Sequence, residues 1–600
     1  ETAIRGADYT LGTVSSRLRN ISEPILRRMT DHERRTLTRS RDLIHATAPF
    51  LRGLDKIKGP AKDQLSMAIL TNDSVAVQRL LAANSPQLLQ EWRRVRALLD
   101  QVGGELMATG KLKNLLPDYF PRVVTDVEGL LNALGKTKRT YMERRLSEAD
   151  NASIAKTGVP LSPLERSQLI NKILAEPSPG NLDPRGNLTK QRSVAAITPD
   201  LLPFYAPPTE ALPLYLRAAT KEIEKARFFG KDAVVSPNGM VNVAGSVGNL
   251  VDREIAAGKL TYKQADEVRS LLTSRFGPGE RGAAGPLADM KNLANMGLLA
   301  QVTSAVVQAG DVAIAAAAHG ILPTIKAVYA MTTRKADRIK VADFGLIDHI
   351  AQEFTTASRS AKMVEGAFKL SGFSLIDQFG KGAALNASYT KYKNWAKTPA
   401  GRAKIAQRYS EYFGADLPQL IQDLQRAGTE RTDLVNELIF RELSDLQPIT
   451  HIEVPQAYLD MPNGRVIYML KTFMLKQMDI VRREVVRDFK AGRARQGTEK
   501  ALKFALALGI SGASTDYIRQ WLMGNDPDPK LSDIPLNVLK TYGWSQYIID
   551  QARKGKPLEA VAGVVAPPYK MFQDLVTAKP ASIKYLPVFG QLLYRQTEDA

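Results

Sequence analysis

The longest apolar stretch of the chain covers residues 292–325 and reads NLANMGLLAQVTSAVVQAGDVAIAAAAHGILPTI. It holds a single formal charge and no proline before Pro323. Its Ala, Leu, Met and Gln residues favour helix, and its 34 residues exceed the roughly 20 that cross a bilayer core. Its polar residues, together with Ala315, are spaced three or four positions apart. On a helix this spacing puts them on one narrow face. These residues are Gln301, Ser304, Gln308, Asp311 and His319.

This segment has three interpretations. In the first it is a buried helix of a large α-helical protein, with Asp311 hydrogen-bonded inside. In the second it enters or crosses a membrane as part of an oligomer, and the polar face lines a water-filled lumen. In the third it is an Ala-rich surface with no special role. Basic residues follow Ile325, and they suit attachment to an anionic leaflet.

The remaining pattern is mostly helical, so we predict a mainly α, extended multi-helix protein with at most a small β-hairpin near residues 233–243. Asn238-Gly239 supplies the positive φ angles of that hairpin's turn. Prolines crowd residues 177–215, which predicts an extended linker because proline breaks helices. The predicted parts are a basic helical domain at 1–176, this linker, a helix and hairpin region at 216–290, a long-helix domain at 291–500 and a short-helix region at 501–600.

Two predicted helices are strongly basic. The first follows Ser22, and either a solvated charged face or contact with phosphates explains its arginines: Arg27, Arg28, Arg34, Arg35, Arg39 and Arg41. The second covers 465–490, where apolar residues alternate by three and four in a seam like that of a coiled coil. The second helix and the residues just after it carry a basic cluster that we interpret as DNA or lipid contacts: Arg482, Arg483, Arg487, Lys490, Arg493 and Arg495.

Composition strengthens the case for an anionic partner. Lys and Arg total 82 against 62 acids, a net charge of +20, which favours nucleic acid, phospholipid head groups or acidic glycans. The chain has no cysteine, which excludes disulfides and thiol chemistry. No signal-peptide pattern is visible, and the chain starts at Glu1, so we expect a processed product or part of a longer chain.

No catalytic, cofactor or metal motif stands out, and we predict a protein that is not an enzyme. Gly129 and Gly135-Lys136-Thr137 resemble a phosphate loop, but five residues separate the glycines where that loop has four. Asp343-Phe344-Gly345 lacks the other kinase motifs. None of the five histidines pairs with another at metal-ligand spacing. We therefore name no catalytic residue, no cofactor and no metal.

Three short motifs carry a family resemblance. They are Leu116-Pro117-Asp118-Tyr119-Phe120-Pro121-Arg122 followed by Gly129-Leu130-Leu131, then Lys471-Thr472-Phe473 with Lys476-Gln477, and Leu586-Pro587-Val588-Phe589-Gly590 with Tyr594. In these motifs the chain resembles the C-terminal portion of the large internal virion (ejection) proteins of short-tailed bacteriophages.

The resemblance implies a protein packed in the virion interior that leaves through the portal and tail. It would then oligomerise with itself and with other virion ejection proteins in the host periplasm and inner membrane. There it would form a channel that conducts the genome. Some relatives carry a peptidoglycan-cleaving or RNA polymerase domain elsewhere in the chain, but no such motif occurs here.

Our hypothesis is a noncatalytic ejection protein that touches phage DNA nonspecifically, with the polar face of 292–325 lining the lumen. A chain without disulfides can pass a portal unfolded, and mostly local helical contacts would let it refold quickly. Two alternatives stay open. One is a nonspecific DNA-binding scaffold in the virion. The other is a noncatalytic part of a larger lytic or polymerase polypeptide.

Overall fold

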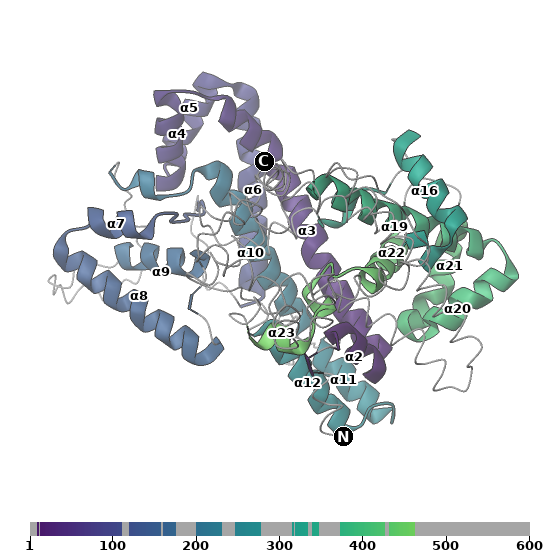
Figure 1. Cartoon of the computed structure of the whole chain (residues 1–600). Helices are drawn as coiled ribbons and strands as arrows, with labels where there is room; N and C mark the ends of the chain where they lie inside the picture. The colour runs from purple at the N-terminus through teal and green to yellow at the C-terminus, as the bar shows by residue number, and fades with distance from the viewer. Residues whose placement is uncertain are drawn as a thin grey trace, which may run out of the picture. The chain divides into compact units, whose positions relative to one another are not determined.

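The protein is mainly α-helical (Figure 1). Of the residues that the computed structural model describes, 83% are helical and 1% are in strands, and no sheet forms among them, so the predicted fold class is confirmed. The hairpin predicted near 233–243 lies outside the described residues. The described residues are 9–10, 12–110, 119–157, 160–161, 163–175, 200–230, 246–277, 315–316, 318–333, 339–346, 373–426 and 431–461.

The chain divides into two compact units. Unit 1 combines residues 1–34 with 257–600, and unit 2 comprises residues 35–256. The boundary falls within helix α3 (Glu23–Lys56), so the predicted domain at 1–176 is not one unit. The reason is long-range bonding, because Ser15 and Arg27 bond to side chains 438 and 410 residues further along the chain.

Unit 2 is a set of helices linked by short turns. Asp73 and Ser85 cap two of them by accepting hydrogen bonds from the next helix's first turn, at 2.9 and 3.3 Å. Helices α4 and α5 lie side by side (Figure 1). After α3 the elements are α4 (Pro60–Thr71), α5 (Ser74–Asn84), α6 (Pro86–Ala108), α7 (Val127–Ala133), α8 (Lys136–Thr157), α9 (Pro163–Ala175), η1 (Leu202–Phe204), α10 (Pro208–Phe228) and α11 (Val247–Ala256).

An extended segment at 119–125 completes the core of unit 2. Phe120 is fully buried, and its ring centroid lies 6.0 Å from that of Trp92. The backbone N–H of Phe120 donates to the side chain of Asn72 at 3.1 Å. Val124 then forms an isolated β-bridge with Tyr205. The described end of the first resemblance motif is therefore a core element that ties helices together.

The predicted extended linker is wrong for its last residues, since α10 begins at Pro208. Pro208 sits in the first turn, where the missing N–H has no helical acceptor anyway. Pro213 lies further inside and removes one helical hydrogen bond. Leu212 and Leu216 on either side are fully buried, and burial of that face outweighs the lost bond.

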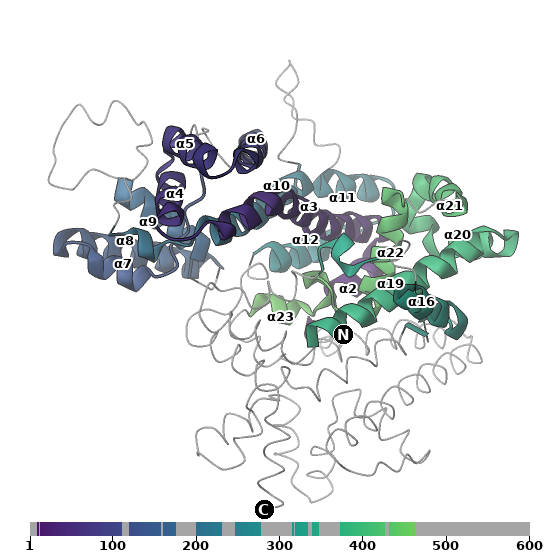
Figure 2. The same cartoon turned by 90° about the horizontal axis from the view of Figure 1, so that it is seen from above.

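Unit 1 is organised around α22, in which every residue from 437 to 446 is buried. Helices α19 and α21 pack against it (Figure 2). The elements are α2 (Val14–Ile21), the start of α3, α12 (Tyr262–Phe276), α16 (Ile321–Thr333), η4 (Val341–Phe344), α19 (Phe373–Ala396), α20 (Pro399–Phe413), η5 (Gly414–Asp416), α21 (Leu417–Gln425), α22 (Asp433–Leu446), η6 (His451–Glu453) and α23 (Gln456–Asp460).

The start of the chain is bonded to the segment that ends the described part. The backbone N–H of Val14 donates to the carbonyl of Val454 at 3.1 Å. The hydroxyl of Ser15 donates to Glu453 at 2.8 Å, and both side chains are buried. The expectation of mostly local contacts therefore fails for α2, whose folded position depends on residues near 454.

We predict that Phe120→Ala destabilises unit 2 by about 3–5 kcal/mol, because it leaves a cavity beside Trp92. Val75, on α5 of the same unit, is 75% exposed, so Val75→Ala is a control that changes stability by less than about 0.5 kcal/mol. Denaturant unfolding followed by circular dichroism measures both. Equal losses in the two variants would contradict a core role for the 119–125 segment.

Candidate nucleic-acid interface

A stretch of unit 1 is basic without any acidic residue. Between Asp377 and Glu411 the sequence has no Asp or Glu. It has seven cations: Lys381, Lys391, Lys393, Lys397, Arg402, Lys404 and Arg408. The structure folds this stretch into α19, a tight turn and α20, and it buries Lys381 and Lys391. We call the other five the basic corner: Lys393, Lys397, Arg402, Lys404 and Arg408, all exposed or half-buried.

The turn between the two helices is tightly constrained. Helix α19 ends at Ala396, and Thr398 caps α20 by accepting from the N–H of Gly401 at 3.1 Å. A Cβ on Gly401 would lie 2.1 Å from the carbonyl oxygen of Trp395, so no side chain fits there. The close approach of the two helices fixes where their cations lie.

An aromatic ring and backbone carbonyls, rather than carboxylates, hold the cations of the turn. The Nζ atoms of Lys391 and Lys404 lie 4.9 and 5.6 Å from the ring centroid of Trp395, within range of a cation–π contact. Arg402 donates to the carbonyl of Ala396 at 3.2 Å. Among the described residues no carboxylate pairs with Lys393, Lys397, Arg402 or Lys404.

A buried carboxylate of α22, that of Glu442, holds Arg408 of the basic corner in place. Glu442 accepts from Arg408 at 2.8 Å and from the hydroxyl of Tyr409. Its other oxygen lies 3.7 Å from Nδ1 of His319. The hydroxyls of Tyr409 and Tyr392 are 3.1 Å apart. One acid thus connects α19, α20 and the residues just before α16.

The protonation states in this cluster follow from burial and charge. Burial acts to raise the pKa of Glu442, but the positive charges of Arg408 and Lys391 outweigh it and lower the pKa to about 2. Burial lowers the pKa of His319 to about 3, although Glu442 acts in the opposite direction. Burial also raises the pKa of Tyr409 well above its ordinary value. At neutral pH the cluster holds one carboxylate, a neutral imidazole and protonated phenols, an arrangement suited to positioning Arg408.

Lys391 connects this cluster to the segment before α16. Its side chain is buried, and its Nζ donates to the carbonyl of Ala318 at 3.0 Å. His319 follows directly, and only 5% of its surface is exposed. In this single chain the His319 ring is therefore enclosed. His319 could line a lumen, as predicted, only if the helices around it were arranged differently from this single chain.

Most predicted site residues lie outside the described residues. These are Gln301, Ser304, Gln308 and Asp311 of the polar face, and all six basic residues Arg482, Arg483, Arg487, Lys490, Arg493 and Arg495. Their roles stay predictions. In the described ranges, no helix has both the length and the apolar content to cross a membrane. No group of three or more metal-ligating side chains gathers in that part of the chain either.

Unit 2 also has a basic helix and a groove, but both carry acidic as well as basic side chains. On α8, Arg139 pairs with Glu143 at 2.8 Å and Arg144 pairs with Glu148 at 3.6 Å, so acids neutralise much of its charge. A groove of about 890 Å³ between α4, α5 and residues 202–207 has side chains of both signs around it. The basic corner differs from both surfaces because its stretch of sequence has no acidic residue.

The sequence interpretation missed the basic corner, although a signal for it was present. The 33 residues from 378 to 410 have no acid while tyrosines and a tryptophan alternate with the cations. Basic residues interleaved with aromatic ones are typical of nucleic-acid contacts. Comparisons of the chain with protein families, curated proteins and solved structures find no match.

We predict that unit 1 loses stability in mild acid through His319. Its pKa is about 3 when folded and near 6.5 when unfolded, so only the unfolded chain takes up the proton between these values. The free energy of unfolding should fall by roughly 1.6 kcal/mol between pH 6.5 and pH 5. His319→Gln should remove most of this loss in denaturant titrations, whereas His45→Gln, at an exposed histidine, should not. Identical pH profiles for all three proteins would contradict the buried neutral state.

Proposed function

We propose that the chain is an internal virion protein that oligomerises into a conduit for the phage genome across the host envelope, and that it contacts the DNA nonspecifically. The observation that supports DNA contact is the basic corner: among the described residues, Lys393, Lys397, Arg402 and Lys404 have no carboxylate partner, and the turn that carries them has no room for a side chain at Gly401. The family resemblance supports the conduit.

The chemistry of the corner fits phosphate rather than bases. Lysines act as point charges and distinguish poorly between sequences, whereas base readout uses bidentate Arg, Asn or Gln side chains in a groove. Arg408 uses part of its guanidinium on Glu442 and so is held in place. Such a site binds through release of counterions, which gives weak, salt-sensitive affinity. Weak contact suits a protein that must let DNA slide past.

We predict that Lys397→Ala combined with Lys404→Ala weakens duplex DNA binding about 10-fold at moderate salt. It should also reduce the slope of log affinity against log salt by about 1.8, which corresponds to two lost phosphate contacts. The matched control is Lys259→Ala with Lys263→Ala, which removes the same charge from exposed lysines of unit 1. Fluorescence anisotropy over a salt series measures this. An equal effect of both double variants would mean that net charge alone drives binding.

The conduit part of the proposal predicts dye release from vesicles. The intact chain should release an encapsulated dye, whereas a DNA scaffold should leave vesicles closed. Gln308→Leu with Asp311→Leu should reduce release while circular dichroism and DNA binding stay unchanged. If that double variant simply unfolds, the segment at 292–325 is a buried helix. If the unaltered chain releases no dye, the scaffold alternative replaces the conduit.

A further inference from the structure

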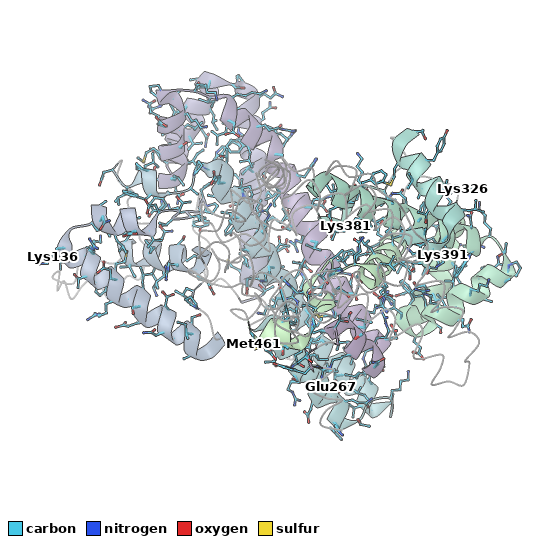
Figure 3. The ribbon with its side chains drawn as sticks, viewed as in Figure 1. Lys136, Glu267, Lys326, Lys381, Lys391 and Met461 are labelled. Carbon is cyan, nitrogen blue, oxygen red and sulfur yellow. The ribbon has the colours of Figure 1, made fainter. Side chains whose placement is uncertain are left out.

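Helix α16 exposes an apolar stripe. Leu322, Ile325 and Tyr329 are 71%, 59% and 64% exposed. They fall at positions i, i+3 and i+7 of one helix face, and the exposed Lys326 lies at i+4 on that face (Figure 3). We call these four residues the α16 stripe. Large apolar side chains this exposed are unusual when they share one face, and they mark a contact surface.

The opposite face of α16 is fixed to unit 1. Thr324 and Ala327 are buried. A Cβ on Gly382 of α19 would lie 2.8 Å from Cε of Met331, so the two helices approach closely. Lys391, further along α19, bonds to Ala318 before α16 begins, so the two helices run in opposite directions. The N-terminal end of the α16 stripe therefore lies toward the end of α19 that leads into the basic corner.

Charge and size argue against a second copy on this stripe. A stable protein interface buries about 800 Å² on each partner, and three side chains fall well short of that. A two-fold pairing of α16 with itself would also bring two copies of Lys326 together near the centre of the helix, which is unfavourable. Lys326 and the lack of acids in α16 favour an occupant that accepts small apolar insertions and carries negative charge.

We propose that the α16 stripe docks in the plane of an anionic phospholipid surface. Leu322, Ile325 and Tyr329 insert at the level of the head groups, and Lys326 reaches the phosphates along its apolar stem. No acidic residue occurs in α16 or between Asp377 and Glu411. We place the basic corner, which follows the end of α19 nearest the N-terminal end of the stripe, beside the same lipid surface, where its cations add attraction. This docking rests on the proposed role at the host envelope, and it requires no membrane-spanning helix.

Vesicle sedimentation of the full chain tests the docking. With vesicles of phosphatidylcholine and phosphatidylglycerol at 7:3, the triple change Leu322→Ser, Ile325→Ser and Tyr329→Ser should weaken binding about 100-fold. Lys326→Glu should weaken it as well. The matched control is Val75→Ser with Tyr262→Ser, at two other exposed apolar positions, and it should have little effect. Thermal unfolding should stay unchanged in all variants, since every altered residue is exposed.

Three outcomes would overturn the docking. The first is equal binding to pure phosphatidylcholine vesicles, and the second is no loss in the triple variant. The third is a triple variant whose only change is a smaller oligomer, which would assign the stripe to a protein partner. If docking fails while dye release and DNA binding persist, the proposed function stands without it. If dye release fails while docking persists, the conduit falls and the lipid contact remains.

Discussion

Unit 1 depends on pairing the charges of one buried helix. Helix α22 has four charged side chains within its buried run: Glu437, Arg441, Glu442 and Asp445. A buried charge without a partner costs several kcal/mol, so each needs an opposite charge in close contact. The partners come from α2, α3 and α20, in the pairs Arg27–Glu437, Glu23–Arg441, Arg19–Asp445 and Arg408–Glu442. The observed arrangement of these helices satisfies all four.

Pairing between arginines and acids also determines which cations remain without an acidic partner. Some arginines of the first basic helix pair with acids far along the chain, whereas Arg35 is exposed. Arg34 pairs with Asp433 in unit 1, and Arg39 bridges Glu105 and Glu224 in unit 2. Many acids of the chain are thus used in internal pairs with arginine. Within the part of unit 1 that the structure describes, Lys393, Lys397 and Lys404 have no such partner, and they lie where α19 turns into α20.

Sequence patterns predicted the helical class because helical periodicity and caps are local. Ser85 and Asp73, for example, cap the helices that directly follow them, as their residue types favour. Pro213 lies within a helix because burial of neighbouring leucines outweighs a local preference. The pairs on α22 could not be predicted, since a Glu and an Arg 410 residues apart share no local pattern. The basic corner could have been found, because an acid-free run is visible in the sequence.

Ionic strength should act differently on the two sets of charges. Exposed cations at the basic corner act on phosphates through water, and their attraction fades over a Debye length of about 8 Å at physiological salt. The α22 members of the charge pairs are buried, so salt screens these pairs less than it screens exposed charges. Moderate salt therefore loosens contacts to DNA or lipid while the fold stays intact. This separation allows one basic protein to hold a polyanion loosely on its surface without weakening the charge pairs that keep its own helices together.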